Sequence, residues 1–260
     1  MVTEFLKGAE PLFLSGSNTG CLLLHGAGGG TTWDLKEFAH TLHSRTGFTI
    51  WLPALTGFGT RPEDLEEVTF SDWMKDAREG VTKLQQTCDR IFIVGHSMGG
   101  VLALLMASEE KKINAVVTWA APINVRFRKI TFLPIIIRIP ILKGLIPKKY
   151  NTGVSLDNEW VGYEWIPSSI GLNVLEGMKR LKQSLNKITC PSFIVQGSMD
   201  EGVSRNSAKR IFKAINSEKK EIWYVEGAPH AIMTDKRFKK ELCARTISFL
   251  ETLDTSQIKR

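Results

Sequence analysis

The stretch Ile91–Glu110, "IFIVGHSMGGVLALLMASEE", decides the fold expected for this chain. Its first four residues are apolar and rich in β-branched side chains, which is typical of a buried strand. Beyond Gly100, apolar residues recur at helical spacing among good helix formers. Ser97 stands between the two runs in a Gly-x-Ser-x-Gly match. The sequence therefore predicts a strand, a tight turn that projects a serine hydroxyl, and a helix.

The two glycines around Ser97 have a physical reason in such a turn. The serine is expected to take a positive φ, and its neighbours two residues away must approach the strand and the helix where a Cβ would collide. This context favours Ser97 as a nucleophile. An ordinary glycine-rich turn with a surface serine is the alternative that the motif alone leaves open.

Length and composition describe an ordinary globular chain. Its 260 residues are 43% hydrophobic and 23% charged, enough for one domain with a sizeable core. The four cysteines lack C-x-x-C spacing, which argues against a zinc site or a disulfide framework and fits a reducing compartment. The start, "MVTEFLKGAEPLF", lacks the apolar region of a signal peptide, so a cytoplasmic location is expected. The net charge of +7 permits contact with anionic surfaces but does not indicate a nucleic-acid partner.

Strands and helices alternate along the chain. Strands are expected at Cys21–Gly26, Phe48–Leu55, Arg90–Gly95, Asn114–Pro122, Cys190–Gly197 and Lys220–Gly227. One amphipathic helix should follow Ser71 as its N-cap, and another should close the chain. Apolar strands separated by helices predict an α/β fold with a mostly parallel sheet and helices on both faces.

The segment Ile123–Ile170 interrupts this alternation. It holds four prolines and no clean strand, and its apolar middle is broken by charged residues, so a membrane-spanning helix is not expected. It follows a strand, which places it above the edge where open α/β sheets bind ligands. We expect a core of residues 1–122 and 171–260 with a cap of residues 123–170 inserted over the site. A structural excursion without a substrate role is the alternative.

A general base for Ser97 should be a histidine, which titrates near neutral pH. The chain has five: His25, His40, His43, His96 and His230. Only His230, in "VEGAPHAIMTD", lies in a loop between the last strand and the final helix, from which it can reach the serine. His40 and His43 fall in a polar helix, His25 in the first glycine-rich turn and His96 inside the serine turn. A solvated loop histidine is the alternative for His230.

An acid should orient that imidazole. Asp200 comes three residues after the glycine that ends a predicted strand, with Glu201 as the runner-up, because a shift of one residue can turn either carboxylate inward. Asp235 is too close to His230 and fits a helix cap. The order Ser97, Asp200, His230 is typical of one class of triad enzymes.

Two backbone N–H groups should stabilise the negative charge that develops on the attacked carbonyl oxygen. Met98, next to the serine, supplies one, and Ala27 in "LLLHGAGGGTTWD" supplies the other. The same turn could suggest a dinucleotide site, but Thr31 stands where G-x-G-x-x-G needs its third glycine. No phosphate-binding G-x-x-x-x-G-K-[ST] occurs either.

The motifs "LLLHGAGGG", "GHSMGG", "VQGSMDEGV" and "GAPHAI", in this order, resemble bacterial carboxylesterases and monoacylglycerol-lipase-type members of the α/β-hydrolase superfamily. The resemblance spans about Cys21 to Leu253 and is weakest in the cap. It implies the α/β-hydrolase fold, a Ser97–Asp200–His230 triad, an oxyanion hole at Ala27 and Met98, no cofactor and a small cap over an acyl pocket. Ala27 is smaller than the residue expected of these esterases.

The expected activity is hydrolysis of carboxylic esters with short-to-medium aliphatic acyl chains through an acyl-enzyme. The apolar cap should contact the acyl chain, with Ile136 and Ile141 as its lining. Basic cap residues are expected at a solvated rim, with lipid contact as a weaker possibility. A thioesterase, amidase or C–C hydrolase with the same triad, or a receptor without turnover, remains open. The expected partner is a small-molecule ester; the oligomeric state is left open.

Overall fold

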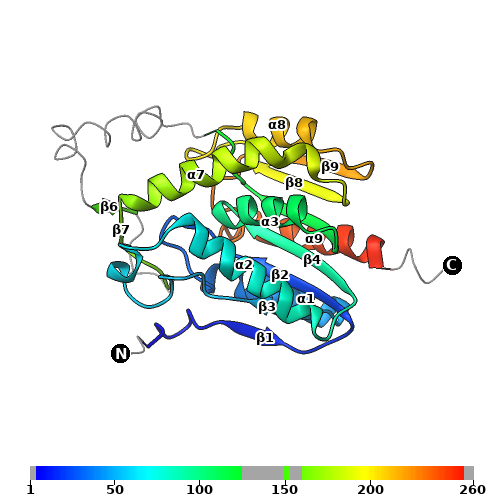
Figure 1. Cartoon of the computed structure of the whole chain (residues 1–260), viewed down its shortest axis with the longest axis horizontal. Helices are drawn as coiled ribbons and strands as arrows, with labels where there is room; N and C mark the ends of the chain where they lie inside the picture. Colours follow the sequence, from blue (N-terminus) through cyan, green and yellow to red (C-terminus); the bar gives the residue numbers. More distant parts are fainter. Residues whose placement is uncertain (1–3, 125–148, 153–159, 255–260) are drawn as a thin grey trace.

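A computed structural model describes residues 4–124, 149–152 and 160–254 of the chain. Seven strands form one sheet in the order β1-β3-β2-β4-β5-β8-β9 (Figure 1). Every neighbouring pair is parallel except β1 and β3. The strands are β1 (Leu12–Leu14), β2 (Thr19–Leu24), β3 (Thr49–Leu52), β4 (Arg90–His96), β5 (Ile113–Trp119), β8 (Ser192–Gly197) and β9 (Lys220–Val225).

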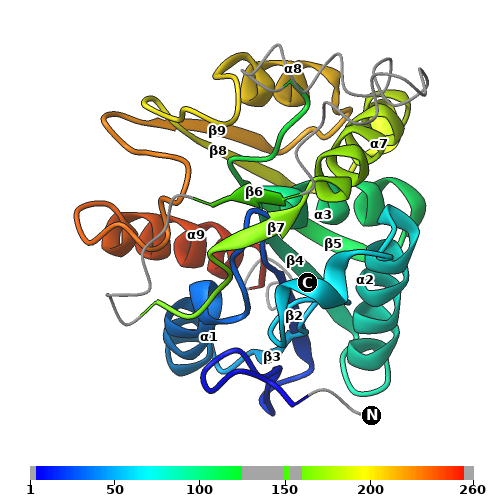
Figure 2. The ribbon, with the colours of Figure 1, turned by 90° about the vertical axis from the view of Figure 1, so that its left-hand side faces the viewer.

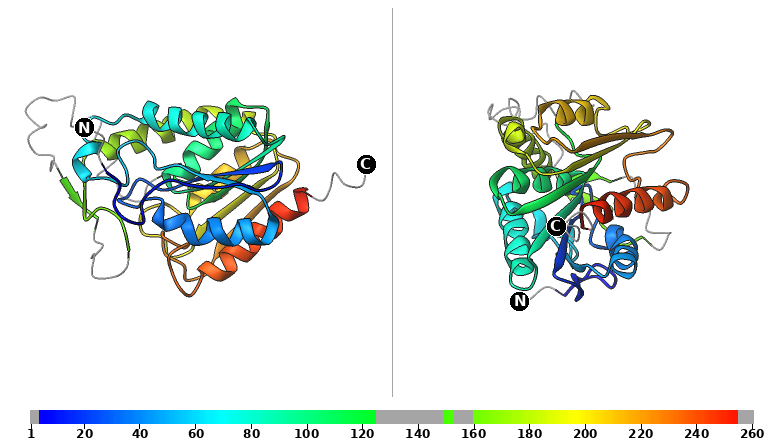
Figure 3. Two further views of the ribbon diagram at one scale, coloured as in Figure 1. Left: turned by 90° about the horizontal axis from the view of Figure 1, so that it is seen from below. Right: turned by 90° about the vertical axis from the view of Figure 1, so that its right-hand side faces the viewer.

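Helices cover both faces of the sheet, and Figures 2 and 3 show the two layers. One face carries α1 (Trp33–Thr46) and α9 (Lys239–Asp254); the other carries α2 (Phe70–Gln85), α3 (Met98–Glu109), α7 (Ser169–Ser184) and α8 (Asn206–Ala214). Side chains of β2 alternate between the two cores: Leu22 packs on the α2–α3 side and Leu23 on the α1–α9 side. This is the α/β fold with a mostly parallel sheet that the apolar strands predict.

The helix boundaries and the strand count differ from expectation in two places. The N-cap of α2 is Thr69 and not Ser71, because Thr69 and Asp72 form a capping box in which each side chain accepts the other's backbone N–H. The edge strand β1 was not predicted. It has three residues and pairs antiparallel with β3, so it is too short to show a periodic pattern.

The inserted segment is described in part. Its two short strands, β6 (Lys149–Asn151) and β7 (Trp165–Pro167), pair antiparallel over the end of the sheet where the parallel strands finish (Figure 2). The expectation that this segment contains no strand was therefore wrong. The N–H of Tyr163 donates to Gly29 O at 2.9 Å, and the Tyr163 hydroxyl donates to Gly57 O at 3.0 Å. These bonds attach the segment to two loops of the core.

The cap boundaries at 123 and 170 remain a prediction. Ile136 and Ile141, the expected acyl-pocket residues, lie outside the described residues. Within the ranges that the structure covers, no helix has the length and apolar character needed to cross a membrane.

Candidate active site

Ser97 occupies the turn between β4 and α3 with φ +52° and ψ −116°. This conformation is costly for a residue with a side chain and persists because the surroundings fix it. The Ser97 N–H donates to Trp119 O at 2.8 Å. A Cβ on Gly95 would lie 2.1 Å from Gly99 O, and one on Gly99 would lie 2.0 Å from Leu24 O. The two glycines thus permit the tight bend that presents the serine hydroxyl.

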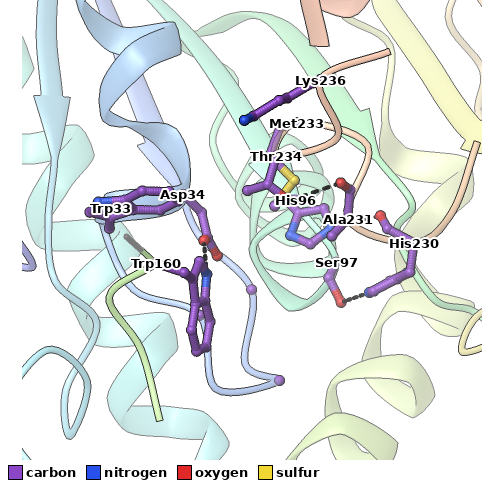
Figure 4. Close-up of a pocket in the computed structure, with 13 residues that line it drawn as sticks. Trp33, Asp34, His96, Ser97, Trp160, His230, Ala231, Met233, Thr234 and Lys236 are labelled. Atoms are coloured by element: carbon purple, nitrogen blue, oxygen red, sulfur yellow. Dashed lines mark hydrogen bonds between the residues drawn. The ribbon is translucent and has the colours of Figure 1, made fainter. Parts of the chain in front are cut away.

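The predicted serine, histidine and acid come together at the carboxyl ends of β4, β8 and β9. His230 Nε2 lies 3.0 Å from Ser97 Oγ, a contact drawn in Figure 4, and His230 Nδ1 lies 2.8 Å from Asp200 Oδ2. Both distances are those of hydrogen bonds. Glu201, the runner-up, is exposed, and the structure describes no hydrogen bond between it and His230. Of the two carboxylates, only Asp200 is placed to orient the imidazole.

Asp200 is completely buried and yet surrounded by donors. Oδ1 accepts the N–H groups of Gly202 at 2.9 Å and Val203 at 2.7 Å, while Oδ2 accepts Gln196 Nε2–H at 2.7 Å in addition to His230. Burial alone would raise the pKa of Asp200, but the hydrogen bond and the charge of His230 and the two backbone amides outweigh it and lower the pKa. The side chain is therefore an anion at neutral pH. Gln196 was not singled out from the sequence.

His25 holds the first glycine-rich turn. It is completely buried; Nδ1–H donates to Gly26 O at 2.8 Å, and Nε2 accepts the Leu55 N–H at 3.1 Å. Burial lowers the pKa of His25 to about 4, so the ring is neutral, as this donor–acceptor pattern requires. In a trans peptide the C=O and N–H point in opposite directions. By fixing the Gly26 carbonyl, His25 also fixes the direction of the Ala27 N–H.

The second expected oxyanion donor, Met98, begins α3 directly after Ser97. The N–H groups in the first turn of a helix lack intrahelical acceptors and carry partial positive charge. Among the hydrogen bonds of the described residues, none uses the N–H of Ala27 or Met98. Their role as donors to an oxyanion stays a prediction.

His96 is a buried neighbour of the proposed base and not a rival to it. Its ring centroid lies 5.0 Å from that of His230, and His96 Nε2–H donates to His230 O at 3.2 Å. Burial, and then the positive charge that His230 can carry, lower the pKa of His96 to about 3. The neutral ring supports the loop that carries His230.

A pocket of about 760 Å³ opens beside Ser97 and His230. Its lining is Gly26, Gly28, Gly30, Trp33, Asp34, His96, Ser97, Trp160, His230, Ala231, Met233, Thr234 and Lys236. Figure 4 shows Asp34 and Trp160 across the pocket from the serine, with Trp160 Nε1–H donating to Asp34 Oδ1 at 2.8 Å. Burial raises the pKa of Asp34 to about 7, against the smaller lowering effect of the Trp160 hydrogen bond.

Sequence reasoning missed Asp34 and Trp160. The available signal was the position of Asp34: it follows the glycine-rich turn in "GGGTTWD" and lies in the first turn of the next helix. Over the portion of the chain with described positions, no cluster of three or more His, Cys, Asp or Glu side chains is arranged to hold a metal ion.

Comparison with known proteins places this chain among hydrolases. The family described as "Serine aminopeptidase, S33" matches residues 17–237. The thermostable monoacylglycerol lipase of Bacillus sp. (strain H-257) is 33% identical over 234 residues, which cover 88% of this chain and 90% of that protein. The carboxylesterase of Bacillus subtilis (strain 168) is 26% identical over 251 residues, which cover 94% of this chain and 97% of that protein.

Solved structures show the same fold. One from a study of the metagenome-derived lipolytic enzymes LipS and LipT superimposes with a TM-score of 0.86 at 25% identity, covering 96% of this chain and 100% of that one. The monoacylglycerol lipase of Paleococcus ferrophilus, at 17% identity, superimposes with a TM-score of 0.76; the match covers 96% of this chain and 99% of that one. With the serine turn, the sheet order and these matches together, the chain belongs to the serine aminopeptidase S33 family of α/β-hydrolases.

Proposed function

We propose that this protein is a serine carboxylesterase that hydrolyses carboxylic esters through an acyl-enzyme intermediate. The observation that carries the proposal is the continuous hydrogen-bonded row from Ser97 Oγ through His230 to the buried Asp200 carboxylate, beginning at a residue with a positive φ. A hydroxyl held in this way has a base for its proton and an anion behind that base. The named relatives, a monoacylglycerol lipase and a carboxylesterase, support an ester as the substrate.

The reaction would run in two steps. His230 takes the proton of Ser97 as Oγ bonds to the ester carbonyl carbon, and the N–H groups of Ala27 and Met98 stabilise the oxyanion. When the C–O bond of the ester breaks, His230 gives that proton to the leaving alcohol. Water then attacks the acyl-enzyme, His230 again carries the proton, and the carboxylic acid leaves with Ser97 restored. Asp200 stabilises the imidazolium in both steps.

The proposed substrates are esters of short-to-medium aliphatic acyl chains, with monoacylglycerols among them. The acyl chain would lie beneath the inserted segment 123–170, whose sequence is strongly apolar. Ile136 and Ile141 are the proposed contacts. Each methylene buried there would contribute up to about 0.8 kcal/mol, so kcat/KM should rise with acyl length until the pocket is full.

The test uses a p-nitrophenyl butyrate burst and a fluorophosphonate probe. The wild type should release a burst of p-nitrophenol and take up one probe per chain, while Ser97→Ala should do neither and keep its circular dichroism spectrum. Ser108→Ala, which changes another serine further along the chain in α3, serves as the matched control and should behave like the wild type. Labelling of Ser97→Ala at the wild-type stoichiometry would identify another nucleophile.

Amide hydrolysis is the second candidate, because the matched family is described as a serine aminopeptidase. The same triad chemistry also serves thioesters and C–C bonds. A panel of butyryl esters, thioesters and anilides on one enzyme preparation separates these activities by kcat/KM. A receptor that kept the fold without turnover would bind these compounds and give no burst.

A further inference from the structure

The wall of the pocket opposite Ser97 carries a carboxyl group that the proposed reaction does not use. Asp34 belongs to the first turn of α1, and Figure 4 shows its side chain beside the Trp160 indole, across the open space from Ser97 and His230. Oδ1 accepts the Trp160 N–H at 2.8 Å. The hydrogen bonds described for this chain include none to Oδ2.

The pair is held in position by the surrounding backbone. A Cβ at Gly30 would lie 2.1 Å from Asp34 Oδ2, so the last glycine of the triplet leaves the room that this carboxyl occupies. The segment that carries Trp160 is fixed to the same turn: Thr31 Oγ1–H donates to Val161 O at 2.6 Å. A polar group in a fixed place on a pocket wall loses little conformational entropy when it binds a ligand.

The chemistry of this wall favours a neutral ligand with hydroxyl groups. A half-buried carboxyl group accepts hydrogen bonds from hydroxyls and, because burial raises the pKa of Asp34 to about 7, a share of the molecules can also donate at neutral pH. The indoles of Trp33 and Trp160, which also line the pocket, add apolar surface. Lys236, another lining residue, disfavours a cationic amine. A carbon chain with adjacent hydroxyls combines both kinds of surface.

The proton transfer from His230 to the leaving oxygen indicates that this wall contacts the alcohol part of the ester. In the proposed mechanism His230 protonates the leaving oxygen, so the leaving group must extend into the space that His230 lines. That space is bounded by the following residues Ala231, Met233 and Thr234 and, on the far side, by Asp34 and Trp160.

We propose that Asp34, oriented by Trp160, binds the free hydroxyls of the leaving alcohol and makes the enzyme selective for monoesters of polyols over esters of simple alcohols. The inference rests on the proposed esterase function and adds the residues that recognise the alcohol of the substrate. Glycerol and a sugar present the same adjacent hydroxyls, so either can be the alcohol.

The test compares glyceryl monobutyrate, glucose monobutyrate and methyl butyrate as substrates of one enzyme. The selectivity is the ratio of kcat/KM for each polyol ester to that for methyl butyrate, which shares the acyl group. Asp34→Ala should lower this ratio by roughly 10- to 100-fold, the effect of losing a hydrogen bond to a charged group. A larger fall for one polyol identifies the alcohol. Trp160→Phe, which keeps an aromatic ring but not the N–H, should lower the ratio by less.

Two controls keep the outcomes distinct. Asp89→Asn changes an exposed carboxylate just before β4, at the other end of the sheet, and should keep the wild-type ratio. If Asp34→Ala does not fold, Asp34→Asn takes its place in the test. Fluorophosphonate labelling of Ser97 then shows whether the site of this variant is intact. An unchanged ratio, or equal losses for methyl and polyol esters, would overturn the inference. A wild type that hydrolyses none of the three esters would instead overturn the proposed function.

Discussion

Replacing Asp200 by asparagine should inactivate the enzyme by reversing the imidazole tautomer. Oδ1 accepts two backbone N–H groups, from Gly202 and Val203, so the amide oxygen of the new side chain must take the Oδ1 place. The amide NH₂ is then forced into the Oδ2 place, against His230 Nδ1. Two donors cannot face each other, so Nδ1 loses its proton and Nε2 gains one. Nε2 then donates towards Ser97 and no longer accepts its proton.

The expected magnitude is a fall in kcat of about 10⁴, the effect of the same change in a serine protease triad. This corresponds to about 5.4 kcal/mol of transition-state stabilisation at 1.36 kcal/mol for each factor of ten. Steady-state hydrolysis of p-nitrophenyl butyrate measures it. Glu201→Gln, which changes the exposed neighbour, is the matched control and should stay within a few-fold of the wild type. A larger effect of Glu201→Gln, or an Asp200→Asn enzyme with more than a tenth of wild-type kcat, would refute the reasoning.

Three further predictions concern the support of the site. Gln196→Met removes a donor to the Asp200 carboxylate and should lower kcat about tenfold, measured with the same ester; wild-type kcat would show that this bond is dispensable. The pKa of His96 falls from 6.5 in the unfolded chain to about 3 in the folded protein, so its titration has no effect on stability above pH 6.5 and lowers the stability as the pH falls from 6.5 towards 3. The stability advantage of the wild type over His96→Asn in urea unfolding should therefore shrink by about 2 kcal/mol from pH 7.5 to 5.0; a constant difference contradicts this. Polar substitution at Ile136 or Ile141 should lower kcat/KM more for octanoyl esters than for acetyl esters. Equal losses would mean that the inserted segment has only a structural role.

The sequence by itself determined the features that depend on neighbouring residues. The strand–turn–helix at Ser97 could be read from a short apolar run, helical spacing and two glycines, because backbone sterics act within a few residues. The parallel sheet followed from apolar strands separated by helices. The chain order of serine, acid and histidine predicts the class of triad, because each falls just after a predicted strand and parallel strands end at one edge.

Only the tertiary structure decided which groups meet. Asp200 and Glu201 are adjacent and have the same chemistry, and the choice depends on how the loop is held by its own amides and by Gln196. Asp34 and Trp160 are 126 positions apart, and no periodicity relates them. The edge strand β1 forms because β3 offers an unpaired edge. Contacts of this kind depend on packing between distant segments, and the local sequence pattern of one segment does not predict which other segment it contacts.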